Sequence, residues 1–349
     1  MNHSQHMDAL TWLGPRSMEM RSTQIPTLKD GEVLIRVSAA GICGSELSGY
    51  LGENSLRVPP LVMGHEASGQ IVQVTAGNLH DGSQAREDVR VTFNPLVTCG
   101  ICDRCRAGRS NLCRTRQIVG IHRPGAFAEY VAVPANLCYP LAATMSTSVA
   151  ALTEPLACSV RAVSLSHVQP DQSLLILGAG PIGLFCLAAA KAQGIQNIVI
   201  SDMSASRLEI ARRWGAQATI QVGEQDLITT IQRLFPGGVD TVIDAVGLNA
   251  TRAQAVQAVV PGGQVVFIGL HHESSPLEAN YLVRQEVTIS GSFSYTPTDF
   301  DHAFAYLEQG LLQADTDWLE ERPLTAGPGA FAELVDGMVA ATKIVLRVG

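Results

Sequence analysis

Six short apolar runs between residues 174 and 291 constrain the fold of this chain more than any other feature. They read LLILG, IVISD, ATIQV, DTVIDAVG, QVVFIG and VTISG, and helix-like stretches, such as 182–193 and 204–214, separate several of them. Strands that are apolar throughout and alternate with helices belong to a parallel sheet covered on both faces. The sequence therefore predicts an α/β fold that includes a doubly wound parallel-sheet domain.

A glycine-rich turn follows the first of these strands. Gly178, Gly180 and Gly183 form a G-x-G-x-x-G pattern, and Asp202 ends the next strand about 20 residues later. In dinucleotide-binding domains such glycines let the backbone approach the pyrophosphate at the start of a helix. The alternative is that the glycines serve only a tight turn. A carboxylate at 202 would bind the ribose hydroxyls and repel the extra phosphate of NADP, which favours NAD, whereas Arg207 could meet that phosphate.

The residues on either side of this domain have a different pattern. Residues 31–40 and 67–74 alternate or run apolar at strand length between glycines, so the first part of the chain, up to about residue 150, is expected to be β-rich. After about residue 290 come an amphipathic stretch at 299–309 and a closing strand, TKIVLRV. This tail could rejoin the β-rich part, which would make the parallel-sheet domain an insertion.

Composition excludes several classes of function. The 349 residues carry a formal net charge of −8, and no Lys/Arg run could follow a phosphate backbone, so nucleic acid is not expected as a partner. No apolar run approaches the ~20 residues of a membrane span, and the start MNHSQHM, whose first six residues are native or a cloning remnant, lacks signal-peptide regions. We expect a cytoplasmic protein, whose eight cysteines are thiols or metal ligands.

Four cysteines cluster in the segment CGICDRCRAGRSNLC. Cys99, Cys102, Cys105 and Cys113 are separated by two, two and seven residues. Four thiolates can close a tetrahedral shell around Zn²⁺ and leave no position for a substrate, so this zinc would be structural. An iron–sulfur cluster is the alternative, but the bacterial ferredoxin pattern ends with a different spacing followed by proline. Cys138, Cys158 and Cys186, in apolar surroundings, are expected in the core.

Cys43, His65, Glu66 and Glu154 are four further potential metal ligands, and they come from three separate segments. With these residues the chain resembles the zinc-dependent medium-chain alcohol dehydrogenases, and more closely their polyol and butanediol (sorbitol dehydrogenase-like) branch. The resemblance spans nearly the whole chain and rests on GICGSE, GHEASG, the four-cysteine segment, GAFAEYVAVP, EPLA, GAGPIG and GSFSYT.

The resemblance implies a GroES-like β-rich catalytic domain, residues 1–155 and 291–349, and a Rossmann NAD-binding domain, residues 156–290, whose cofactor site would also include Ile182 and Phe293. It implies that Cys43, His65 and Glu66 bind a catalytic zinc, with Glu154 as a direct or water-bridged partner. Such a ligand set balances the charge of Zn²⁺, which then stays electrophilic enough to stabilise an alkoxide.

By the same resemblance, Ser45 begins the proton path, and Glu46 fixes the ring of His65 from behind. The alternative for Glu46 is a solvated surface carboxylate. Three positions depart from the family pattern: Ser48 replaces a common histidine, so the proton relay must use hydroxyls or water, Ser294 replaces an arginine of the sorbitol branch, and Arg161 replaces a frequent histidine. The serine at 294 weakens sorbitol as the substrate, and we assign no role to Arg161.

The expected reaction transfers hydride from a secondary alcohol or polyol to NAD and gives a ketone or aldehyde. Within this class, a sugar-alcohol phosphate (galactitol-1-phosphate-like) or L-threonine is the alternative substrate, and a phosphate would require a basic pocket, for which Arg57 and Arg123 are candidates. From another class, a non-enzymatic zinc-ribbon interaction module is the alternative. His271 and His272 line the nicotinamide pocket or lie in an exposed loop. The family implies a homo-oligomer, a dimer or tetramer.

Overall fold

The computed structural model describes residues 6–312 and 317–349, so most of the segment 1–6 lies outside the described residues. The described part divides into two compact units. The first contains the residues up to Glu154 and those from Leu307 onward, and the second contains Pro155–Tyr306. Within the described residues, no helix combines the length and apolar character needed to cross a bilayer.

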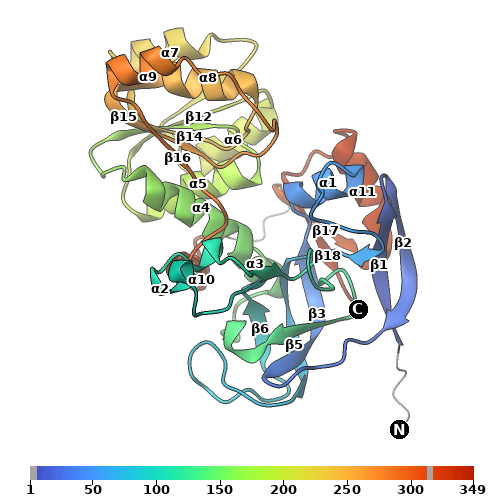
Figure 1. The fold of residues 1–349 in the computed structure, drawn as a ribbon. Coiled ribbons are helices and arrows are strands. Elements are labelled where there is room, and N and C mark those ends of the chain that lie inside the picture. Colours follow the sequence, from blue (N-terminus) through green and yellow to red (C-terminus); the bar gives the residue numbers. More distant parts are fainter. Residues whose placement is uncertain (1–5, 313–316) are drawn as a thin grey trace. The chain divides into compact units, whose positions relative to one another are not determined.

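The second unit is built on a six-stranded sheet in which every neighbouring pair is parallel (Figure 1). The strand order is β13-β12-β11-β14-β15-β16. The strands are β11 (Ser173–Leu177), β12 (Asn197–Asp202), β13 (Ala218–Gln221), β14 (Val239–Asp244), β15 (Val259–Phe267) and β16 (Thr288–Gly291). All five residues of β11 are buried, as expected for a sheet covered on both faces. The predicted doubly wound α/β fold is therefore confirmed.

Helices precede and follow the strands of this sheet. They are α4 (Thr153–Ser166), α5 (Pro181–Ala192), α6 (Ala205–Arg213), α7 (Leu227–Leu234), α8 (Asn249–Ala258), α9 (Ala279–Gln285) and α10 (Pro297–Glu308). Helix α5 lies on one face of the sheet, and α7 and α8 lie on the other (Figure 1). The strand order reverses between β11 and β14, and the carboxyl end of such a reversal is where ligands bind in open α/β sheets. The glycine-rich turn between β11 and α5 lies at this point.

The first unit is β-rich. Its larger sheet has the order β10-β6-β5-β3-β18-β17, with β9 also paired to β3, and smaller sheets join β2-β1-β4 and β7-β8. The strands are β1 (His6–Gly14), β2 (Ser17–Gln24), β3 (Glu32–Gly41), β4 (Leu61–Val62), β5 (Glu66–Val74), β6 (Arg90–Phe93), β7 (Leu96–Val97), β8 (Gln117–Ile118), β9 (Tyr130–Pro134), β10 (Cys138–Pro140), β17 (Leu319–Pro323) and β18 (Lys343–Arg347). The closing strand β18 pairs antiparallel with β3, so the tail completes the sheet of the first unit.

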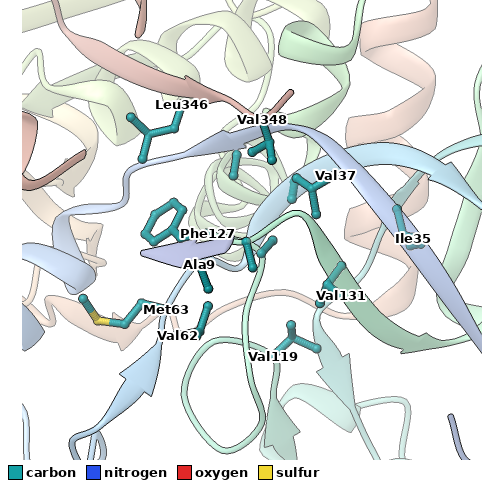
Figure 2. Close-up of a cluster of buried hydrophobic side chains, with 14 of the residues drawn as sticks. Ala9, Ile35, Val37, Val62, Met63, Val119, Phe127, Val131, Leu346 and Val348 are labelled. Atoms are coloured by element: carbon teal, nitrogen blue, oxygen red, sulfur yellow. The ribbon is translucent and has the colours of Figure 1, made fainter. Parts of the chain in front are cut away.

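Short helices connect these strands. They are α1 (Gly44–Leu51), α2 (Asp103–Arg106), α3 (Thr147–Ala151) and α11 (Gly327–Val335), with 3₁₀ turns η1 (Ser110–Leu112), η2 (Ala135–Leu137) and η3 (Leu324–Ala326). Inward-facing side chains of the strands form one apolar core. Figure 2 shows part of it, where Ala9 of β1, Val37 of β3 and Val131 of β9 gather with Phe127 and Leu346. This core fixes the ends of β3 and β5, from which the candidate site is built.

The cysteines outside the two candidate metal sites differ in burial. Cys138 and Cys186 are buried, as predicted, and burial raises the pKa of the Cys186 thiol to about 12. Cys158 is only partly buried, contrary to the expectation. It lies on a stripe of α4, with Arg161 and Leu165, that is less buried than the rest of the helix. The 3.6-residue period of the helix therefore overrides the apolar surroundings of Cys158 in the sequence.

Candidate active site

Cys43, His65 and Glu66 converge in the first unit. Cys43 lies two residues after the end of β3 and directly precedes α1. Glu66 opens β5, which pairs antiparallel with β3 so that Gly41 lies opposite Glu66. This register places the two segments side by side. One potential ligand atom from each of the three side chains lies within 4.8 Å of the other two. Glu154, which is buried at the start of α4, does not belong to this group.

Gly41 provides the space for the carboxylate of Glu66. A Cβ atom at position 41 would lie 2.1 Å from Glu66 Oε2. Real Cβ atoms do not approach another heavy atom so closely, so a side chain here would displace the carboxylate. Glycine at this position of β3 therefore allows Glu66 to turn toward its cross-strand neighbour.

Glu46 holds the ring of His65. Its Oε1 lies 2.9 Å from His65 Nδ1 and accepts a hydrogen bond from Gly64 N, while its Oε2 accepts one from Cys43 N. The side chain is completely buried, so it is not the surface carboxylate that was the alternative expectation. Because Nδ1 faces Glu46, Nε2 is the nitrogen left for a metal.

Glu46 and His65 each stabilise the charged form of the other. Burial would raise the pKa of Glu46, but the charge of His65 and its hydrogen bond, with help from Arg57, hold that pKa below its usual value. Burial would likewise lower the pKa of His65, but the carboxylate of Glu46 and the contact with Cys43 raise it well above its usual value. The imidazole therefore lies in a site that favours positive charge.

The residues of this group suit a zinc ion. A thiol, an imidazole and a carboxylate are the ligand types that zinc takes in proteins. Among the described residues, none donates a hydrogen bond to the buried Glu66 Oε1. An unpartnered buried carboxylate oxygen is costly unless something else neutralises it, and a cation between the three ligand atoms would do so.

Ser45 and Arg57 extend the site. Ser45 Oγ lies 3.4 Å from Cys43 Sγ, and Arg57 Nη2 donates to Ser45 Oγ at 3.3 Å. Arg57 is 4% exposed, and its Nε and Nη1 have no hydrogen-bond partner among the described residues. Arg123, the other candidate for a basic pocket, instead forms a partly buried ion pair with Glu32 at 2.5 Å. Its charge is therefore already balanced.

The four predicted structural ligands also converge. One sulfur atom from each of Cys99, Cys102, Cys105 and Cys113 lies within 4.8 Å of the other three. Cys102 Sγ lies 3.6 Å from Cys105 Sγ, and Cys113 Sγ lies 3.5 Å from Cys99 Sγ. Hydrogen bonds from the backbone amides of Cys105 and Arg114 lower the pKa of Cys102 to about 6. A thiolate is thus available at neutral pH, and the thiolate is the form that binds a metal.

The dinucleotide residues surround the turn between β11 and α5. Gly178 has a φ of +95°, a left-handed conformation that favours glycine. Asp202 Oδ2 accepts from Ala179 N at 2.7 Å, and its Oδ1 accepts from Ser204 N at 2.8 Å. The carboxylate at the end of β12 thereby ties the glycine-rich turn to the start of α6.

The remaining predicted residues of this unit vary in their surroundings. Arg207 lies half-buried in the first turn of α6, and the carbonyl of Ile182 accepts from Ser159 Oγ. Phe293, just after β16, is 38% exposed. His271 and His272 are exposed, as in the second of their two expected environments. Arg161, which had no expected role, lies 3.7 Å from Asp299 of α10.

Sequence reasoning did not identify Lys343, which contacts this site. Its Nζ lies 2.5 Å from Glu66 Oε2, and both side chains are buried. Lys343 follows Glu66 by 277 positions, so no local spacing could connect them. The only signal was a lysine directly before the apolar run IVL of the closing strand, KIVLRV.

Comparisons with known proteins find relatives of this chain along most of its length. Residues 29–143 match the alcohol dehydrogenase GroES-like domain, and residues 181–309 match the zinc-binding dehydrogenase domain. The sorbitol dehydrogenase of Bacillus subtilis is 33% identical over 89% of each chain. The D-arabitol-phosphate dehydrogenase of Enterococcus avium is 32% identical over 93% of this chain and 92% of the relative.

Solved structures show the same relationship. An alcohol dehydrogenase from Escherichia coli CFT073, solved with NADH, superimposes with a TM-score of 0.90 at 27% identity and covers 99% of this chain and 100% of its own. The relatives match the chain along almost its full length, and both domain families are represented in it. The chain therefore belongs to the zinc-dependent medium-chain alcohol dehydrogenase family and is a dehydrogenase.

Proposed function

We propose that this protein oxidises a secondary alcohol or polyol with NAD, using one catalytic and one structural zinc ion per chain. The observation that carries the proposal is the convergence of Cys43, His65 and Glu66, with an unpartnered carboxylate oxygen, in a chain that also has a dinucleotide-binding turn. The first unit would bind the catalytic metal, and the second would bind the nucleotide.

Each residue of the proposed catalytic site has a separate role. Cys43, His65 and Glu66 would hold a zinc ion, which supplies Lewis acidity that favours loss of the proton from the substrate hydroxyl. Glu46 keeps His65 in the tautomer whose Nε2 is free. Ser45 is the hydroxyl beside Cys43 and would receive the proton. Glu154 would be a water-bridged partner rather than a simultaneous fourth ligand, because it is not part of the converging group.

The experiment that tests this function combines metal analysis with an NADH screen over diols, pentitols, hexitols, their phosphates and threonine. We expect about two zinc ions per chain. Cys43→Ser should remove one ion and abolish turnover while the fold is kept. Cys102→Ser is the matched control, which should remove the other ion and mainly lower stability. One ion in the parent protein and no NADH from any alcohol would favour the zinc-ribbon interaction module instead.

NAD is the proposed cofactor because the carboxylate of Asp202 ends β12, where it would repel a 2′-phosphate. The opposing observation is a zinc-binding dehydrogenase from Sinorhizobium meliloti, 30% identical, that was solved with NADP. Asp202→Ala should lower the ratio of kcat/KM for NAD to that for NADP. Arg207→Ala should leave this ratio unchanged if NAD is the natural cofactor. A ratio that Asp202→Ala does not change would contradict the assigned role.

An anionic polyol is the second candidate substrate. Arg57 favours it, since a buried guanidinium with two unpartnered nitrogens lies one serine away from Cys43. Relatives named for D-arabitol phosphate and L-galactonate support this class. Arabitol and its phosphate form a matched pair, and Arg57→Gln should raise the KM for the phosphate selectively. An equal change for both substrates would mean that Arg57 only balances the charge of Glu46.

The proposed setting is the cytoplasm, and the proposed assembly is a homo-oligomer, a dimer or tetramer. None of the eight cysteines forms a disulfide, which suits a reducing compartment. Light scattering on the purified protein measures the assembly directly, and a monomer at micromolar concentration would contradict it.

A further inference from the structure

A buried lysine lies beside Glu66 at the candidate metal site. Lys343, the first residue of β18, is 2% exposed, and its Nζ lies 2.5 Å from Glu66 Oε2 and donates to the carbonyl of Ile42 at 2.8 Å. Strand β18 pairs with β3 so that Val345 lies opposite Gly41. The backbone of two neighbouring strands therefore fixes the ammonium group beside the carboxylate.

The two oxygens of Glu66 have different surroundings. Oε2 faces Lys343 in the space that Gly41 leaves open, whereas Oε1 lacks a hydrogen-bond donor among the described residues. A buried ammonium needs a partner of opposite charge, so Lys343 binds Oε2 firmly. The carboxylate can then offer its other oxygen to a cation, but it cannot give that cation its full charge.

The charges of the site show what Lys343 changes. Cys43 as thiolate, Glu46 and Glu66 carry three negative charges, while Arg57 and Lys343 carry two positive charges, so these five groups sum to −1. A divalent cation brings these five groups to +1, and to 0 when the buried carboxylate of Glu154, the proposed water-bridged partner, is counted as well. Without Lys343 each of these totals would be one unit more negative. The lysine therefore adds one positive charge in a buried place, where a negatively charged oxygen of the substrate is favoured.

We propose that Lys343 is a positioning residue that shares Glu66 with the metal. It holds Oε2, directs Oε1 toward Cys43 and His65, and weakens the hold of the carboxylate on the ion. This inference rests on the proposed function of the site as a zinc centre. It adds that the ligand set binds zinc less tightly than it would without Lys343, and that the ion is more electrophilic as a result.

The test is the zinc affinity of the catalytic site, measured by competition with a chelator in Lys343→Met and in the charge-conserving control Lys343→Arg. Loss of the same ion in Cys43→Ser identifies the catalytic site. Removing a positive charge from beside a cation should raise zinc affinity by about tenfold or more in Lys343→Met. Lys343→Arg should stay close to the parent protein. An unchanged or lower affinity in a folded Lys343→Met protein would overturn the proposal.

A second background protects the test against misfolding. Glu66→Gln removes the buried carboxylate, so Lys343→Met leaves no unpaired negative charge in that background. In the Glu66→Gln background, Lys343→Met should raise zinc affinity several-fold less than it does in the parent protein. An equal rise in both backgrounds would show that Lys343 acts on the ion directly, and it would overturn the proposal that Lys343 shares Glu66 with the metal. A parent protein that binds only one zinc ion would instead reject the proposed function itself.

Discussion

Replacing Gly183 by alanine is expected to destabilise the second unit, although alanine is the better helix former. A Cβ atom at this position would lie 1.8 Å from the carbonyl oxygen of Gly178, whereas carbon and oxygen atoms in contact are normally about 3.3 Å apart. The obstacle is backbone, so α5 would have to withdraw from the turn by about 1.5 Å. Overpacking on this scale costs about 3 kcal/mol, against about 1 kcal/mol gained in helix propensity.

The net loss of about 2 kcal/mol corresponds to a melting temperature lower by about 4–8 °C for a unit of this size. Gly180→Ala is the matched control, because a Cβ there meets nothing within 4 Å and the φ of −69° suits alanine. It should change stability by less than about 0.5 kcal/mol but weaken NAD binding, since the motif brings the pyrophosphate against this backbone. Thermal melts and fluorescence titration with NADH measure both effects. Equal melting temperatures for the two variants would refute the reasoning.

Three further predictions concern the metal sites and a helix cap. Cys102→Ser should release about one zinc ion and lower the melting temperature, whereas retention of two ions in metal analysis would contradict the four-thiolate site. Glu46→Gln should cost about 10–100-fold in metal affinity by chelator competition, because the ring of His65 loses its carboxylate; unchanged affinity would argue against that role. The carboxylate of Asp226 caps α7 by accepting from Thr229 N at 2.8 Å, and this lowers its pKa. Its stabilisation should be complete above its unfolded pKa of about 3.9 and disappear as pH falls through the lower folded value, so denaturant titrations at pH 3–6 should show less acid sensitivity in Asp226→Ala.

The architecture could be predicted because short, local sequence patterns determine its strands and turns. Each strand of the six-stranded sheet is a local apolar run, and the glycine-rich turn has a fixed spacing, so β11 and α5 could be located from the sequence alone. The four-cysteine site was equally local, since its ligands lie within 15 residues. In contrast, the burial of Cys158 depends on which face of α4 packs inward, and that is decided by neighbours far away in the chain.

The catalytic candidates were only partly accessible to such reasoning. Cys43, His65 and Glu66 could be grouped through the family resemblance, and the register of β3 and β5 gives the physical reason that they meet. The sequence could not show that Arg57 has unpartnered nitrogens whereas the charge of Arg123 is balanced, because the difference depends on the ion pair of Arg123 with Glu32. The contact of Lys343 with Glu66 could not be predicted either, because only the tertiary pairing of β18 with β3 brings the two residues together.

The position of β18 in the sequence has a consequence for biosynthesis. At translation rates of about 5–20 residues per second, the ribosome adds Lys343 roughly 14–55 s after Glu66. The whole second unit is synthesised during that delay. A nascent chain that captured zinc early would do so with a carboxylate not yet restrained by its ammonium partner. The emergence of the closing strand is therefore the step at which the metal centre acquires its mature charge.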